Sequence, residues 1–212
     1  MIGDLISGIN QTEMHEEIGL NLASSLGALT RQNPDVIMTS DLPDYETVER
    51  ALILAGQHLV LGGMQRNDAV SVICSLQNMG IEPYKISENL KLVLAQRTVR
   101  CICKKCKRDA KVKPGVLKSM GVETKMIKEG TFSKGHGCPQ CRGTGFQGRM
   151  FIFEVLLVND SIRELILSPA HTHMIKKVAI EQGMITLRQS GIQAVLKGLT
   201  TLAEIARATE AD

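Results

Sequence analysis

Residues 36–63 read VIMTSDLPDYETVERALILAGQHLVLGG. Val36–Thr39 and His58–Leu61 are short apolar runs of the length expected for buried strands in a parallel sheet. Between them, Asp44–Ala55 has helical spacing, and Asp44 stands at the N-cap position that aspartate favours. A strand, a helix and a second strand in this order predict a parallel sheet covered by helices on both faces. The segment therefore predicts an α/β domain.

The helical pattern continues on both sides of this segment. Ile18–Arg31 precedes it and Asn67–Met79 follows it, and Gly80 is placed to end the second helix. Pro83 opens further helical turns, which we expect to continue to Leu94.

The second half of the chain begins with a change in composition. Residues 97–150 are rich in Lys, Arg, Gly and Cys and have little periodicity. An apolar, strand-like run follows at Phe151–Val158. The remaining pattern predicts four helices, at 161–167, 171–182, 187–196 and 201–208.

Composition excludes several classes of protein. The 212 residues carry a formal net charge of +3 and are 43% hydrophobic and 22% charged, which is typical of globular domains. No run approaches the ~18 consecutive apolar residues of a membrane span, and no secretory leader follows Met1. Aromatic residues are only 3%, without Trp, which argues against a stacking platform for single-stranded nucleic acid. We therefore expect a cytoplasmic protein with no direct nucleic-acid partner.

Four cysteines form two Cys-x2-Cys pairs, Cys103 with Cys106 and Cys138 with Cys141. Thiols stay reduced in the cytosol, so the two pairs predict four thiolates around a tetrahedral Zn²⁺. Four sulfurs leave no open coordination position, and the predicted role of the metal is structural.

Other interpretations of the cysteines remain open. The thiols could be reduced and metal-free, or one pair could be redox-active, although neither pair opens a helix after a strand. Cys101 could replace Cys103 as a ligand, but only Cys103 gives the two-residue gap to Cys106. His136 lies close enough to Cys138 in the sequence to compete for the metal.

Several further motifs follow one another along nearly the whole chain. They are RQNPDVIM at 31–38, GQHLVL at 56–61, MGIEP at 79–83, VLAQR at 93–97, TGFQGR at 144–149 and GLTTL at 198–202. In this order they resemble the ATPases of type II secretion and type IV pilus assembly, and residues 31–38 are similar to the Arg-Gln-Asp-Pro-Asp-Val-Val-Met segment of that family. The tetracysteine element resembles the assembly ATPases, whereas the pilus-retraction members generally lack it.

This resemblance implies three segments. Residues 1–98 would be the C-terminal part of a RecA-like P-loop ATPase core, with a parallel sheet flanked by helices. Residues 99–150 would be a tetracysteine zinc-binding subdomain, and residues 151–212 a strand followed by a C-terminal helical region. Family members work as cytoplasmic homo-hexamers, peripheral to the inner membrane through a platform protein. They convert ATP hydrolysis into the assembly of pilin-like fibres.

The chain departs from the family at the residues that carry the chemistry. The sequence contains no Gly-x4-Gly-Lys-[Ser/Thr] loop, which in the family lies upstream of this part, so we expect Mg-ATP binding only with the upstream region. The family's Gly-Glu at the end of the Walker B strand is Ser40-Asp41 here, which makes Asp41 the candidate catalytic acid, shorter by one methylene. Gln65 stands at the position of the family's histidine, and glutamine can bind a phosphate or water but cannot carry a proton.

Three functions follow as hypotheses. The first is a structural or regulatory subunit, or fragment, of the hexameric ATPase, with a weakened hydrolytic site. The alternative is an active assembly motor in which an upstream Walker A loop works with Asp41. A zinc-ribbon module that binds nucleic acid is the third, and its binding would depend strongly on salt.

Overall fold

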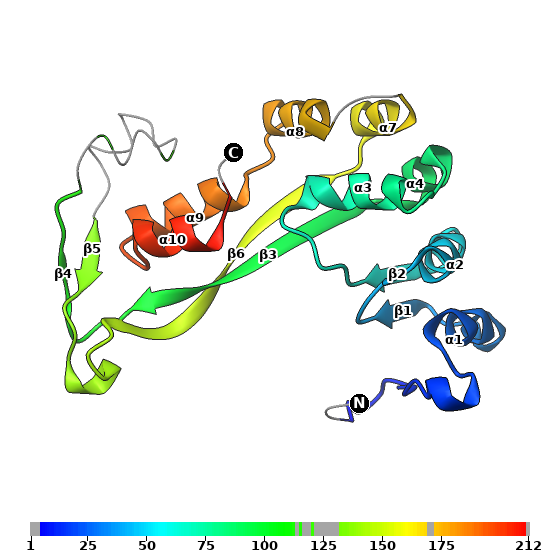
Figure 1. Cartoon of the computed structure of the whole chain (residues 1–212), viewed down its shortest axis with the longest axis horizontal. Helices are drawn as coiled ribbons and strands as arrows, with labels where there is room; N and C mark the ends of the chain where they lie inside the picture. The colour runs from blue at the N-terminus through cyan, green and yellow to red at the C-terminus, as the bar shows by residue number, and fades with distance from the viewer. Residues whose placement is uncertain (1–4, 113–114, 116–119, 121–131, 169–171, 211–212) are drawn as a thin grey trace.

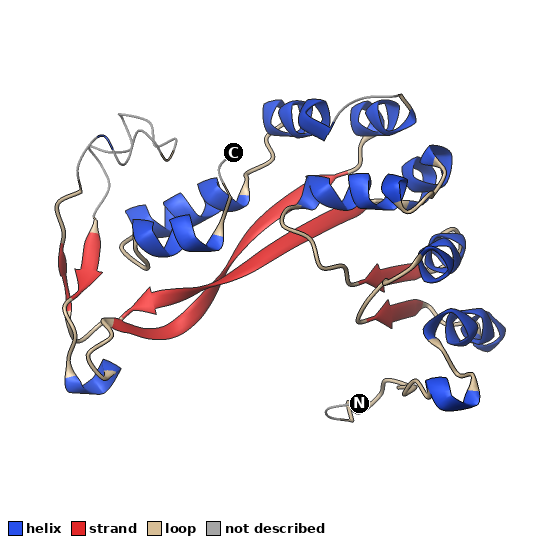
Figure 2. Ribbon diagram, viewed as in Figure 1, coloured by secondary structure: helices blue, strands red, loops and turns tan. Residues whose placement is uncertain are grey.

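The computed structural model describes residues 5–112, 115, 120, 132–168 and 172–210. Within this part of the chain the strands form three two-stranded sheets. The longest is the antiparallel ribbon of β3 (Leu92–Ile102) and β6 (Phe146–Leu157), which runs through the molecule (Figures 1 and 2). The parallel pair β1 (Val36–Thr39) and β2 (Leu59–Gly62) lies beyond one end of this ribbon, and the antiparallel pair β4 (Lys107–Asp109) and β5 (Ser133–Gly135) beyond the other.

The predicted strand–helix–strand unit is present. β1 and β2 pair in parallel, with Val36 opposite Leu59, and α2 (Tyr45–Ala55) connects them. The Asp44 side chain accepts a hydrogen bond from the Thr47 backbone N–H at 2.8 Å and caps α2 as predicted. α1 (Leu22–Leu29) packs beside α2, and a small apolar core forms from Leu26, Ile37, Ala51 and Leu54.

The expectation that both strands are buried, with helices on both faces of the sheet, was wrong for the described residues. Ile37 is buried beneath α1 and α2, but its neighbours Val36 and Met38 are exposed, as are Leu59 and Leu61 of β2. Successive strand residues point to opposite faces, and the helices of this unit cover one face only.

Helix ends follow local capping chemistry. The helix expected from Ile18 begins instead at Leu22, because Gly19 has a φ of +79° and the Asn21 side chain accepts from the Ser24 backbone N–H at 2.8 Å. α3 (Ala69–Asn78) has Asp68 as its N-cap in a capping box. The prediction that Gly80 ends this helix is confirmed, with a φ of +93°.

The helical turns expected to reach Leu94 were also wrong. α4 spans Pro83–Asn89, and the chain then enters β3 at Leu92. Its partner β6 begins at Phe146, five residues before the predicted strand, and the pairing runs from Leu92 opposite Leu157 to Ile102 opposite Phe146.

Helices cover one face of the ribbon in two groups. α3, α4, α7 (Asp160–Leu167) and α8 (Thr172–Glu181) lie at the end nearer β1 and β2, and α9 (Leu187–Leu196) and α10 (Leu202–Ala208) lie further along (Figure 1). The last four helices match the sequence prediction closely, although residue 171 lies outside the described residues. The larger core includes Ile73, Ile86, Leu156, Ile162 and Ile175. The second includes Val99, Ile152, Ile192, Val195 and Ile205. No helix in the described ranges is both long and apolar enough to cross a bilayer.

Glu204 joins α10 to the ribbon. Its carboxylate is buried and accepts hydrogen bonds from the Arg100 backbone N–H at 3.0 Å and side chain at 2.7 Å, and from the Arg207 side chain at 2.8 Å. These donors, those of Arg207 first, hold the pKa of Glu204 far below its usual range.

The Glu204→Gln variant should therefore melt lower than the wild type at neutral pH, by about 5 °C. A carboxyl group with a depressed pKa in the folded state stabilises the protein above its unfolded pKa, about 4.3, and this stabilisation is lost as the pH falls further. The difference in Tm should be largest at pH 7 and shrink below about pH 4. Thermal melts of both proteins from pH 7 to pH 3 measure it, and a constant difference would contradict the role of the ionised carboxylate.

Candidate metal centre and strand-end residues

Two turns bring the four predicted cysteines together at the end of the ribbon. Cys103 follows β3 directly, and Cys106 ends the turn before β4. Cys138 is the N-cap of the 3-10 turn η3 (Pro139–Cys141), between β5 and β6, and Cys141 is the last residue of this turn. Their four sulfurs all lie within 4.8 Å of one another, which makes a group able to hold a metal ion.

The distances between the sulfurs fit a tetrahedral metal. The Sγ atoms of Cys103 and Cys138 are 3.8 Å apart, those of Cys106 and Cys141 are 3.8 Å apart, and those of Cys138 and Cys141 are 3.7 Å apart. A tetrahedron with Zn–S bonds of about 2.3 Å has S···S edges of about 3.8 Å. The donor set and its spacing therefore both suit Zn²⁺.

Hydrogen bonds favour the thiolate form at one corner of the cluster. Burial raises the pKa of the Cys141 thiol, but the backbone N–H groups of Cys138 and Gly145 donate to its sulfur at 3.2 and 3.3 Å, and the pKa falls to about 6. Burial raises the pKa of Cys106 to about 11. A metal would favour the thiolate of both, because thiolates are the binding form.

Close backbone contacts shape the cluster. A Cβ on Gly135 would lie 2.0 Å from the Gly145 carbonyl oxygen, so a larger residue would push these two segments apart. The Cys103 backbone N–H donates to the same carbonyl at 3.0 Å. Of the alternatives, Cys101 and His136 lie outside the group of ligand atoms found among the described residues.

Asp41 and Gln65 follow the carboxyl ends of the two parallel strands. Gly63, just after β2, donates from its backbone N–H to the Thr39 carbonyl oxygen at 3.1 Å, and Asp41 comes two residues after Thr39. The carboxyl ends of parallel strands are where α/β proteins bind ligands. The Asp41 carboxylate accepts from the Leu42 backbone N–H at 2.9 Å, and Gln65 is exposed.

Sequence reasoning missed the residue that anchors this loop. Arg97 of β3 donates from Nη2 to the carbonyl oxygens of Arg66 and Asn67, both at 3.1 Å, and to the Asn67 side chain at 3.3 Å. Its only signal in the sequence was its place in VLAQR, and the contact joins residues 30 positions apart.

A family model described as "Type II/IV secretion system protein" matches residues 4–207. The chain belongs to this family. Its relatives include the "Type IV pilus assembly ATPase PilB" of Thermus thermophilus, 42% identical over 94% of this chain and 23% of the relative. The protein of the same name from Myxococcus xanthus is 40% identical over 97% of this chain and 37% of the relative. "Type II secretion system protein E" of Pectobacterium carotovorum is 36% identical over 97% and 40%.

This secretion-family chain therefore spans less than half the length of these curated relatives. Solved structures support the fold. The pilus retraction motor PilT with bound ADP matches with a TM-score of 0.60 at 23% identity, over 88% of this chain and 43% of that one. The Legionella pneumophila ATPase DotB matches with a TM-score of 0.60 at 15% identity, over 87% and 41%. The α/β fold predicted from the sequence is confirmed.

Proposed function

We propose that this chain is the zinc-binding C-terminal part of an ATPase that powers type II secretion or type IV pilus assembly, and that it serves assembly or regulation more than hydrolysis. In this proposal Cys103, Cys106, Cys138 and Cys141 hold Zn²⁺. The metal would cross-link the turn after β3 to the turn before β6. Four sulfur ligands would complete its coordination, so it would supply rigidity and no activated water.

The proposal rests on the contrast between the cysteine cluster and the residues that follow β1 and β2. The four cysteine sulfurs lie within 4.8 Å of one another, and three of their pairs are 3.7–3.8 Å apart. Beyond the carboxyl ends of β1 and β2, Asp41 stands where the family has a longer acid and Gln65 stands where the family has a histidine. A displacement of about 1 Å in a catalytic group can cost roughly 10²-fold in rate, and glutamine cannot transfer a proton. The four cysteines of the family's metal site are thus present, whereas two residues at the family's catalytic positions are replaced.

Family membership supports the rest of the assignment. We infer that the protein works as a homo-hexamer in the cytoplasm, held at the periphery of the inner membrane by a platform protein. Mg-ATP binding would need the family's phosphate-binding loop, which these 212 residues do not contain. The support is the family match over residues 4–207 and the similarity to the pilus assembly ATPase PilB and to type II secretion system protein E.

The active motor is the second candidate, and one observation favours it. Asp41 still places a carboxylate beyond the end of β1, beside the loop that leaves β2. Such a group could polarise the attacking water in a complete ATPase site.

Mg-ATP turnover by the product of the complete gene separates the two candidates. We expect turnover near background, with hexamers still forming, and no further loss in the Asp41→Asn variant. Asp35→Asn, in the turn that enters β1, is the matched control. Robust turnover that Asp41→Asn reduces by 10²-fold or so, while Asp35→Asn does not, would instead make the protein a motor with an unusual acid.

A further inference from the structure

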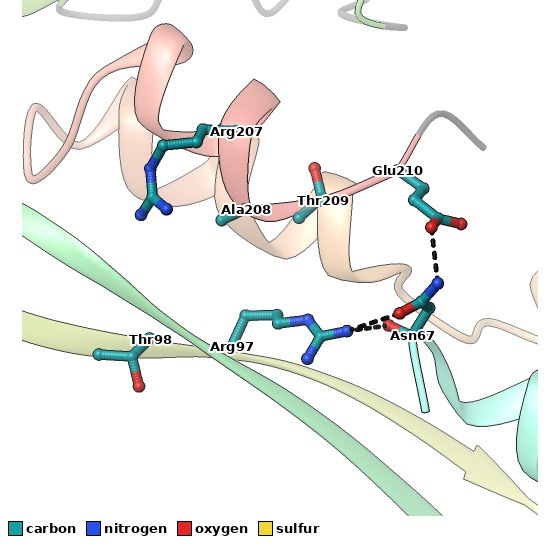
Figure 3. A pocket seen from close by; sticks show the side chains of 7 residues that line it. All are labelled: Asn67, Arg97, Thr98, Arg207, Ala208, Thr209 and Glu210. Atoms are coloured by element: carbon teal, nitrogen blue, oxygen red, sulfur yellow. Dashed lines mark hydrogen bonds between the residues drawn. The ribbon is translucent and has the colours of Figure 1, made fainter. Parts of the chain in front are cut away.

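A cavity of about 380 Å³ lies on the molecule outside the metal centre, between the ribbon and the C-terminal end of α10. Three segments distant in the sequence line it: Asn67 from the loop before α3, Arg97 and Thr98 from β3, and Arg207–Glu210. Figure 3 shows Arg207 reaching from α10 toward the strand that carries Arg97 and Thr98. The volume is in the range of small-ligand sites.

Both arginines that line the cavity are already oriented. All hydrogen bonds that Arg97 makes within the described part of the chain use Nη2. Arg207 uses Nε and Nη2 on Glu204, at 3.2 and 2.8 Å. Each guanidinium therefore keeps N–H donors for another acceptor and loses little conformational freedom on binding one.

The charge around the cavity is positive. Glu204 is shared between Arg207 and Arg100, so its carboxylate does not neutralise both. Arg188 adds a further charge, because it donates to the Thr209 backbone carbonyl at 2.9 Å. Of the charged residues that line the cavity, two are arginines, Arg97 and Arg207, and one is a carboxylate, Glu210. The groups bonded to this lining add Arg100 and Arg188 against Glu204.

Glu210 extends into this cavity as an internal anion. Its carboxylate accepts from the Asn67 side-chain amide at 2.7 Å (Figure 3). Asn67 belongs to the loop that also carries Gln65, and Arg97 donates hydrogen bonds to the same loop. The C-terminal segment therefore contacts the loop that carries Gln65 through the Glu210 carboxylate. A bound anion would repel this carboxylate.

The geometry points to an anion site for small phosphate-bearing ligands, bound between the guanidinium groups of Arg97 and Arg207, with Glu210 as a competing intramolecular carboxylate. Guanidinium groups suit phosphate because their planar forks match its oxygens and they stay charged. Binding would displace Glu210 from Asn67 and so release the C-terminal segment from the loop. The inference is independent of whether the protein hydrolyses ATP.

Backbone amide NMR of the full chain, titrated with inorganic phosphate, pyrophosphate or ADP, tests the site. Pyrophosphate should shift the amides of Thr98 and Thr209, and Glu210→Gln should bind it roughly threefold to tenfold more tightly, because a nearby negative charge is removed. Glu210 is exposed, so this variant carries little risk of misfolding. Arg207→Gln should weaken binding at least about tenfold, and added salt should weaken it further.

Arg163→Gln is the matched control, since it removes the same charge at a second cavity, lined also by Tyr84 and Leu167. It should leave pyrophosphate binding unchanged. Equal affinity for pyrophosphate and ADP would identify a site for free phosphates, and tighter ADP binding a site for nucleotides. The proposal is overturned if neither the wild type nor Glu210→Gln shows these shifts with any of the three probes at up to about 10 mM, or if folded Arg207→Gln binds as the wild type does.

Discussion

Replacing both Cys138 and Cys141 by serine will abolish zinc binding and unfold β4, β5 and η3, while the larger core stays folded. The two residues supply half of the sulfurs in a cluster whose atoms lie within 4.8 Å of one another. Structural zinc contributes about 10–16 kcal/mol of apparent binding free energy in small zinc modules. The strands β4 and β5 are only three residues each. Zinc content should fall from about one per chain to near zero.

Hydrogen exchange shows where the order is lost. Amides of β4, β5 and η3 should exchange freely in the double variant, whereas those around Ile73 and Ile162 should keep their protection, because they lie in the larger core. Cys101→Ser is the matched control, since it changes a nearby cysteine outside the cluster and should keep the metal. A double variant that retains full zinc would show the ligand assignment to be wrong.

The parts that the sequence predicted well are those determined by neighbours in the chain. Two residues separate the cysteines in each pair, so each turn presents two sulfurs whatever the rest of the fold does. The caps of α2 and α3, at Asp44 and Asp68, are equally local. The four C-terminal helices have clear apolar periodicity, and their bounds were close to those observed.

The ribbon was harder to predict because its strands do not alternate cleanly. In β3, Val93 is buried while Leu92 and Leu94 on the opposite face are apolar but exposed, so the pattern suggested continued helical turns. In β6, the first residues include Gly148, with a φ of +78°, and a charged Arg149, which resemble a loop. The two strands pair at ten positions. This pairing between distant segments determines the ribbon, and the hydrophobic pattern of either strand alone does not show it.

Long-range polar contacts could not be predicted at all. Arg97 binds a loop 30 residues earlier, and Glu210 binds Asn67 across 143 residues. The acid Glu154 within the apolar run of β6 did carry a signal, since a buried carboxylate requires partners. Nothing in a single sequence identifies which residues those partners are.

Glu154 provides the second prediction of large effect. Its side chain is 1% exposed, and its two oxygens accept from the backbone N–H groups of Ala69 at 2.8 Å and Leu187 at 3.0 Å. These are the first residues of α3 and α9, so one carboxylate binds two helix N-termini. Ala69 lies in the larger core and Leu187 in the second, which makes Glu154 the polar link between them.

Glu154→Gln should destabilise the protein by about 2 kcal/mol, because the amide nitrogen would face a backbone donor and leave it unpaired. Glu154→Ala should cost about 3–5 kcal/mol, since it leaves two buried donors unpaired and opens a cavity. Denaturant unfolding measures both values, and Glu164→Gln, an exposed glutamate of α7, should change stability by less than about 0.5 kcal/mol. Amide exchange at Ala69 and Leu187 should accelerate together in the Glu154→Ala variant, because a single carboxylate protects both. Acceleration at only one of them, or a cost for Glu154→Ala no larger than that of the control, would show that Glu154 does not join the two helices.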